Sequence, residues 1–148
     1  MVTINYQAVD RTARNIGDQN QEEMKMKFYK CDICGNMVDV VKASGVPMMC
    51  CGQKMTELVP GTTDASVEKH VPVIKVDGNK VNVFVGSAEH PMMEEHFIEW
   101  IVLETKQGSQ RKALKPGAAP SADFVLADGD EVVAAYEYCN LHGLWKAE

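Results

Sequence analysis

Every cysteine and every histidine of this 148-residue chain falls into one of two groups. The first group contains only thiols: Cys31, Cys34, Cys50 and Cys51. The second contains four imidazoles and one thiol: His70, His90, His96, Cys139 and His142. Thiolate and imidazole are the usual protein ligands of zinc, iron and copper. Two groups of different composition predict two different metal sites, and the imidazole-rich one suits a redox metal such as iron or copper.

The thiol group begins with a C-x-x-C pair and ends with two adjacent cysteines. Four thiolates around one ion make a closed tetrahedral site, which zinc and iron both accept. The adjacency of Cys50 and Cys51 is unusual, because neighbouring side chains point apart and should widen one sulfur–metal–sulfur angle. Gly35 and Gly52 each follow a cysteine, where glycine permits the positive φ that folds backbone around a metal. A structural zinc site is the alternative to iron, and a disulfide between the adjacent cysteines is the weaker one.

The imidazole group is gathered from short loops. His90 and His96 bracket the segment HPMMEEH, and His70 stands at the start of a predicted strand. Cys139 and His142 lie in a C-x-x-H turn that follows the last long strand. Five ligands on one octahedral ion leave the sixth position open. An open position suits a reaction centre rather than a site that only transfers electrons.

A blue-copper domain is the competing interpretation of the same residues. Such a site uses two histidines, one cysteine and a weak axial methionine. The segment GLWKAE after His142 contains no methionine, and two further histidines would have no role. This pattern favours iron.

The elements that position the second group are predicted as strands. KHVPVIKV and KVNVFVG flank Asp77-Gly78, which is a hairpin signal. ADFVLADGDEVVAAYEYC predicts two more strands around Asp128-Gly129. The alternation of HFIEWIVLET places four residues on one face: His96, Ile98, Trp100 and Val102. Short alternating strands separated by turns predict an all-β fold with a sandwich.

The chain divides into three predicted segments. Residues 1–25 are a polar N-terminal extension of unknown role. Residues 26–62 hold the four-thiol site and are too few to bury a stable core alone, so a metal is expected to stabilise them. Residues 63–148 form the sandwich.

Composition excludes some classes of partner. The formal net charge of -6 argues against nucleic acid, whose binding needs clustered Lys and Arg. No apolar run approaches the roughly 20 residues that span a bilayer, and the N-terminus has no apolar signal region. Clustered cysteines without an export signal indicate metal ligands in a reducing cytoplasm.

From about Lys27 to Glu148 the chain resembles desulfoferrodoxin, the two-iron class of superoxide reductase. The motifs that carry the resemblance are YKCDICGN, CCGQKM, EKHVPVI, HPMMEEHFIEW, LKPG and YCNLHGLW. Residues 1–25 depart from the family pattern. The resemblance implies a small desulforedoxin/rubredoxin-like domain followed by an immunoglobulin-like β-sandwich, as a homodimer.

The resemblance also implies two iron ions per chain. One is a distorted tetrahedral iron held by the four clustered cysteines. The other is square-pyramidal, with the four histidines equatorial and Cys139 axial. The implied reaction is one-electron reduction of superoxide to hydrogen peroxide, as oxygen-stress detoxification, with electrons from a protein such as rubredoxin. In the family, the glutamate and the lysine just before the first histidine ligand are also functionally important. In this chain they are Glu68 and Lys69.

These two residues suit that chemistry. Superoxide is an anion and the protein is acidic, so a local positive field is needed at the site, and Lys69 is the best-placed source. Glu68 would bind the open position once the metal is oxidised. A pure electron carrier or redox sensor without turnover is the second hypothesis. A structural zinc protein is the third, and it explains only the four thiols.

Overall fold

The protein is built almost entirely of antiparallel strands. A computed structural model describes residues 25–148, so the predicted extension, apart from Lys25, lies outside the described residues. The all-β prediction is confirmed. The elements in chain order are β1 (Phe28–Lys30), β2 (Met37–Asp39), β3 (Met49–Cys50), β4 (Gln53–Lys54), β5 (Thr56–Leu58), α1 (Val67–His70), β6 (Pro72–Asp77), β7 (Lys80–Val85), β8 (Ile98–Thr105), β9 (Gly108–Ala113), β10 (Ser121–Val125), β11 (Val132–Cys139) and β12 (Gly143–Ala147).

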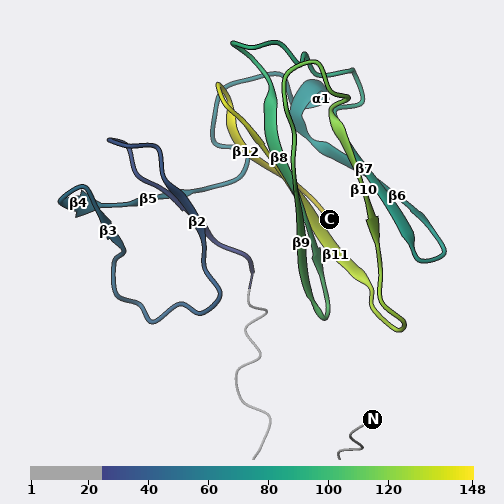
Figure 1. Ribbon diagram of the computed structural model, residues 1–148, viewed down its shortest axis with the longest axis horizontal. Helices are drawn as coiled ribbons and strands as arrows, with labels where there is room; N and C mark the ends of the chain where they lie inside the picture. Colours follow the sequence, from purple (N-terminus) through teal and green to yellow (C-terminus); the bar gives the residue numbers. More distant parts are fainter. Residues whose placement is uncertain (1–24) are drawn as a thin grey trace, which may run out of the picture.

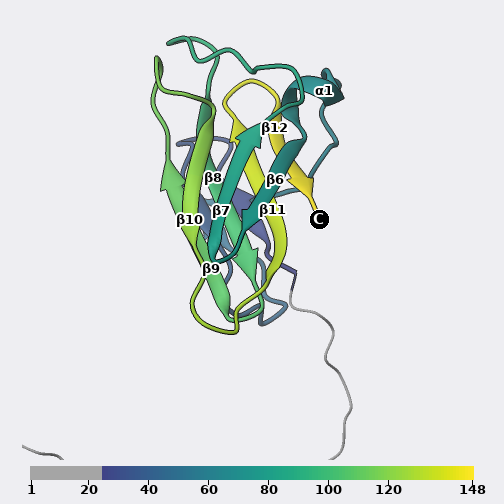
Figure 2. The same ribbon diagram turned by 90° about the vertical axis from the view of Figure 1, so that its right-hand side faces the viewer.

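Strands β6 to β12 form the predicted sandwich of two sheets (Figure 1, Figure 2). One sheet has the order β10-β7-β6 and the other the order β12-β11-β8-β9. Alternation in β7 explains how a sheet covers the core, because Val81, Val83 and Val85 are buried while Asn82 and Phe84 between them are half-buried. The core between the sheets contains, besides these valines, Ile98, Ile101, Leu103, Phe124 and Cys139.

Two Asp-Gly pairs have different outcomes. The first closes the predicted hairpin, since β6 and β7 pair in register from Pro72–Val85 to Asp77–Lys80. The second lies between strands that do not pair with each other: β10 pairs with β7, whereas β11 pairs with β8 and β12. The loop containing Gly129 therefore carries the chain from one sheet to the other.

The predicted single face of β8 is wrong at its first residue. Trp100 and Val102 belong to an outer apolar cluster, but Ile98 belongs to the inner core. The reason is a bulge: Tyr138 pairs with Trp100 and Cys139 pairs with Ile98, which leaves Glu99 as an extra residue. A bulge of one residue reverses the side-chain alternation.

His70 is also placed differently from the prediction. It is the last residue of the one-turn helix α1, and not the first residue of a strand. Pro72 begins β6 instead. The residue before a proline is pushed toward extended backbone, so the helix ends at His70 and Val71 is extended. No helix within residues 25–148 is long and apolar enough to cross a membrane.

The cysteine-rich unit packs on the outer face of the β12-β11-β8-β9 sheet (Figure 1). It consists of the sheet β2-β1-β5 and the small hairpin β3-β4. Phe28 is 5% exposed, with its ring centroid 5.1 Å from that of Trp100 and 5.4 Å from that of Tyr136. The sandwich therefore completes the apolar core of a unit too small to have its own. The boundary between residues 62 and 63 stays a prediction.

Candidate metal centres

The imidazole-rich group converges at the end of the sandwich where α1 lies (Figure 2). His70 ends α1, and His90 and His96 lie on the loop between β7 and β8. Cys139 ends β11, and His142 lies in the turn before β12. One ligand atom of each residue lies within 4.8 Å of every other. The fold thus brings together all five residues that the sequence singled out.

The four imidazole rings form a square. Taken in the order His70, His90, His96 and His142, neighbouring ring centroids are 4.6–4.9 Å apart. The His70–His96 diagonal is longer, at 6.5 Å. Neighbouring rings are nearly perpendicular, with interplanar angles of 74° to 83°. Four rings in this arrangement can each direct one nitrogen at a common centre.

Backbone carbonyls fix the nitrogen that two of these rings present. Nδ1 of His70 lies 2.7 Å from the Ser66 carbonyl, and Nδ1 of His90 lies 2.6 Å from the Pro91 carbonyl. A carbonyl only accepts, so each Nδ1 carries the proton and each Nε2 of a neutral ring carries a lone pair. Those two Nε2 atoms face each other at 3.2 Å, and His142 Nδ1 lies 2.9 Å from His70 Nε2. The two Nε2 lone pairs of His70 and His90, facing each other at 3.2 Å, need a cation between them.

Protons are poor candidates for that cation. Burial lowers the pKa of His70 and of His96, and it lowers the pKa of His90 to about 4. The buried Nε2 of His96 has no hydrogen-bond partner among the described residues, which is costly unless it binds something else. Two nitrogens bound at right angles to one metal at about 2.1 Å lie about 3 Å apart, as the nitrogens do here. The donor set therefore fits a metal ion.

Cys139 supplies the one sulfur of this group. Its side chain is fully buried, and its Sγ lies 3.7 Å from His142 Nδ1. Burial raises the pKa of the thiol, while the backbone N–H groups of Leu141 and His142 donate to the sulfur and lower it. The same N–H groups would stabilise the thiolate once a metal replaces the proton. Four neutral imidazoles and one thiolate fit a mononuclear iron centre.

Glu68 and Lys69 lie beside this group, on the exposed side of α1. The charge of Lys69 contributes, after burial and the neighbouring histidines, to lowering the pKa of His70 and His96. Its positive field therefore reaches the imidazoles. The Glu68 carboxylate is not among the ligand atoms that gather within 4.8 Å.

Sequence reasoning missed two residues next to the group. Trp145 stacks on His70 at 5.1 Å, and its Nε1 donates to the His142 carbonyl at 3.0 Å. Glu137 shares the inner face of β11 with Cys139, and within the described residues neither carboxylate oxygen has a hydrogen-bond partner. Burial raises the pKa of Glu137 to about 9. A glutamate at an inward position of VVAAYEYC was the available signal for it.

The four thiols form a second group, with all Sγ atoms within 4.8 Å of one another. Cys34 and Cys50 have their sulfurs 3.6 Å apart, and Cys50 and Cys51 have theirs 3.9 Å apart. Tetrahedral ligands with metal–sulfur bonds of about 2.3 Å have sulfurs about 3.8 Å apart. All five cysteines of the chain are free thiols in the structure, which excludes the disulfide alternative there.

Local backbone geometry turns the chain around these thiols. Gly35 and Gly52 have φ of 78° and 76°, as predicted, and Cys51 itself has φ of 49°. Backbone N–H groups of Cys34 and Ile33 lower the pKa of Cys31 to about 7. Hydrogen bonds with Cys34 and Cys31 raise the pKa of Cys51 to about 12. All four sulfurs can carry charge together only when a cation joins them.

Comparisons with known proteins agree with this arrangement. The family model described as desulfoferrodoxin matches residues 62–148, and the one described as desulfoferrodoxin, N-terminal domain, matches residues 23–58. The desulfoferrodoxin of Nitratidesulfovibrio vulgaris is 52% identical over 122 residues, covering 82% of this chain and 95% of the relative. A desulfoferrodoxin homolog of Archaeoglobus fulgidus is 50% identical, covering 82% and 96%.

A solved structure is similar over the same range. The superoxide reductase from Treponema pallidum has a TM-score of 0.72 and 38% identity, covering 84% of this chain and 99% of that one. The predicted fold, a small desulforedoxin-like unit followed by a β-sandwich, is confirmed. Because the matches cover both units and most of the chain, this protein belongs to the desulfoferrodoxin family.

Proposed function

We infer that this protein is a superoxide reductase. It reduces superoxide by one electron and, with two protons, forms hydrogen peroxide without releasing oxygen. The observation that carries the inference is the convergence of four neutral imidazoles and one buried thiol, in a chain of this family. The similar structure from Treponema pallidum is itself a superoxide reductase.

The five converging residues would hold an iron ion, which supplies the reducing electron when bound: His70, His90, His96, His142 and Cys139. Contacts outside the ligand group orient these side chains. The Ser66 and Pro91 carbonyls orient two rings, and the Trp145 ring covers one of them. Prearranged ligands of this kind are held by their outer hydrogen bonds.

Lys69 is proposed to guide superoxide to the site. The whole protein has a formal charge of -6 and repels an anion. Lys69 is exposed, makes no ion pair within residues 25–148, and has a field that reaches two of the imidazoles. A local positive charge beside a site raises the encounter rate of an anion in a salt-dependent manner.

Glu68 is proposed to occupy the open coordination position after oxidation. A carboxylate is a hard ligand and prefers the more highly charged oxidation state. Its carboxylate lies outside the ligand group in this structure, so it must move to bind. It is one residue from Lys69 on the same short helix, which places both at the same edge of the site.

The second metal and the partners are further proposals. The four clustered cysteines hold a second iron, giving two iron ions per chain. Cys34 and Cys51 are exposed, so an electron-donor protein such as rubredoxin can approach this site closely. Homodimer formation and a cytoplasmic location are what membership of the family suggests. The function is then detoxification of superoxide.

The product distinguishes this function from dismutation. The reduced, iron-loaded protein is mixed with a superoxide pulse, and peroxide and oxygen are both measured. A reductase gives one peroxide for each superoxide and no oxygen, whereas dismutation releases oxygen. Cys139→Ser should lose the reaction, and it should also lose the visible thiolate-to-iron charge-transfer absorption (the thiolate band) of the oxidised histidine site. Cys34→Ser should keep both the reaction and this band. Oxygen release, or full activity of Cys139→Ser, would overturn the proposal.

A further inference from the structure

Gly86, the residue after β7, is buried against the backbone of α1. Its φ is 81°, and a methyl group on its Cα would lie 2.7 Å from the Lys69 carbonyl oxygen and 2.8 Å from that of Glu68. The carbonyl oxygen of Ala88 would be closer still. Backbone oxygens cannot rotate away as a flexible side chain can. Among the glycines of residues 25–148, this is the one where an added methyl would collide with backbone.

The segment Gly86–Ala88 also donates hydrogen bonds to α1 and to the residue that follows it. The N–H of Ala88 donates to the Glu68 carbonyl at 3.0 Å, and the Ser87 hydroxyl donates to it at 3.3 Å. The N–H of Gly86 donates to the Val71 carbonyl at 3.2 Å. A helix of one turn has few internal partners for its last carbonyls, so this loop supplies them.

We propose that Gly86 is a positioning residue for Glu68 and Lys69. Its missing side chain lets the segment Gly86–Ala88 close against α1, and α1 presents both side chains beside the metal site. The proposal rests on the proposed function, because that function gives the two side chains their roles. It adds a residue that is not itself one of the five candidate metal ligands.

A methyl group at this position should move the two exposed residues more than the ligand beside them. His70 has its own restraints, namely the Ser66 carbonyl at 2.7 Å and the Trp145 ring at 5.1 Å. Glu68 and Lys69 have exposed side chains, so their position depends on the backbone of α1 alone. The candidate metal ligands should therefore stay in place while Glu68 and Lys69 are displaced.

Gly129→Ala is the matched control for Gly86→Ala. Gly129 has φ of 74°, so both substitutions put alanine into the left-handed region. A methyl group on Gly129 would meet nothing within 4 Å, and this residue lies on the β10–β11 loop, away from α1 (Figure 1). The difference between the two variants isolates the collisions with α1 and with the Ala88 carbonyl from the cost of the backbone conformation.

Three measurements on the iron-loaded protein test the proposal. Gly86→Ala should lower the low-salt rate with superoxide roughly threefold to tenfold and flatten its salt dependence. Azide should bind the oxidised protein more tightly, because Glu68 is displaced. Hydrogen exchange at the Ala88 amide should become faster. Iron content and the thiolate band should not change, and Gly129→Ala should match the unaltered protein in all three.

A double variant shows whether Gly86 acts through Lys69. In a Lys69→Ala background, Gly86→Ala should add little further loss of rate. Fully additive losses would overturn the proposal, as would unchanged azide binding and unchanged exchange in the single variant. If Gly86→Ala does not fold or bind iron, Ser87→Ala replaces it. Ser87→Ala should show a smaller change of the same kind, and no change would overturn the proposal.

The outcomes separate this proposal from the proposed function. If the unaltered protein does not react with superoxide, the proposed function fails. Azide binding and amide exchange would then still decide whether Gly86 positions the edge of the metal site. If the unaltered protein reacts and Gly86→Ala is indistinguishable from Gly129→Ala, the positioning role alone fails.

Discussion

Lys30 Nζ donates a hydrogen bond to the Tyr138 hydroxyl at 3.0 Å, and this contact links the strands that lead into the two candidate metal sites. Lys30 directly precedes Cys31, and Tyr138 directly precedes Cys139. Tyr138 is 3% exposed and stacks on Trp100 with centroids 5.6 Å apart. The hydrogen bond with Tyr138 is the main cause that raises the pKa of Lys30. This hydrogen bond therefore joins β1 of the cysteine-rich unit to β11 of the sandwich.

Removing this contact should loosen the small unit from the sandwich. Lys30→Met and Tyr138→Phe should each lower the free energy of unfolding by about 1 kcal/mol, the usual net value of one hydrogen bond. The double variant should lose little more than either single one. Urea unfolding curves measure all three, with Lys54→Met at an exposed position of β4 as the control. Full additivity would show that the two side chains do not interact.

The two metal sites should be separable by substitution. Cys51→Ser should lose the metal of the four-thiol site and destabilise residues 27–60, because that unit depends on Phe28 and the metal for its core. The histidine site should keep its visible band, and superoxide should still oxidise it. Metal analysis and optical spectra of the variant decide this. Loss of both metals together would contradict the division into two units.

Lys69→Ala and Glu68→Ala should have different effects. Lys69→Ala should slow the bimolecular reaction with superoxide and flatten its salt dependence, because steering acts on encounter. Glu68→Ala should leave that step nearly unchanged and alter the oxidised state, with a shifted spectrum and easier binding of added anions. Stopped-flow kinetics at low and high salt measure both, with Lys80→Ala at the far end of the sandwich as the control. Equal slowing in both variants would contradict separate roles.

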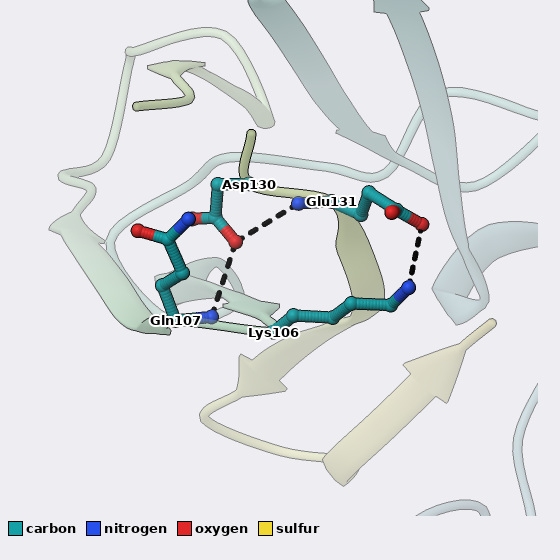
Figure 3. A network of polar contacts seen from close by, with 4 residues as sticks. All are labelled: Lys106, Gln107, Asp130 and Glu131. Carbon is teal, nitrogen blue, oxygen red and sulfur yellow. Dashed lines mark hydrogen bonds and ion pairs between the residues drawn. The ribbon is translucent and has the colours of Figure 1, made fainter. Parts of the chain in front are cut away.

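Stability at acid pH should depend on Asp130, which joins two loops (Figure 3). Desolvation raises the pKa of Asp130, but hydrogen bonds from Thr105, Glu131 and Gln107 outweigh it and lower the pKa below its ordinary value. A carboxyl whose pKa is lowered by folding stabilises the folded state above the unfolded pKa. This contribution is lost as the pH falls through the folded pKa.

Asp130→Asn should therefore be less stable than the unaltered protein at pH 7. The difference should begin to shrink below about pH 4, where the carboxyl becomes protonated in the unfolded state, and should vanish once the pH lies below the folded pKa as well. Thermal unfolding of both proteins across this pH range measures it. Asp128→Asn, in the same loop, is the control. A difference that grows toward acid pH would contradict the assignment.

Residue types and their order were enough to single out the two groups that the fold brings together. Imidazole and thiol are the donors that such metals require, and each chain segment brings its donor with it, so the chemistry of His90 or Cys34 needs no knowledge of the fold. The hairpin at Asp77-Gly78 was predictable for a similar reason, since turn and strand preferences act between near neighbours.

The tertiary structure decided which atoms face each other. The bulge at Glu99 moved Ile98 to the inner core, and it depends on the pairing of β8 with β11, far away in the sequence. Phe28 became a core residue only because the sandwich lies beneath it, and Gly86 became important only because α1 packs against it. Glu137 is buried for the same reason. A local pattern specifies donors and turns, whereas burial, register and close backbone approach arise from contacts between distant segments.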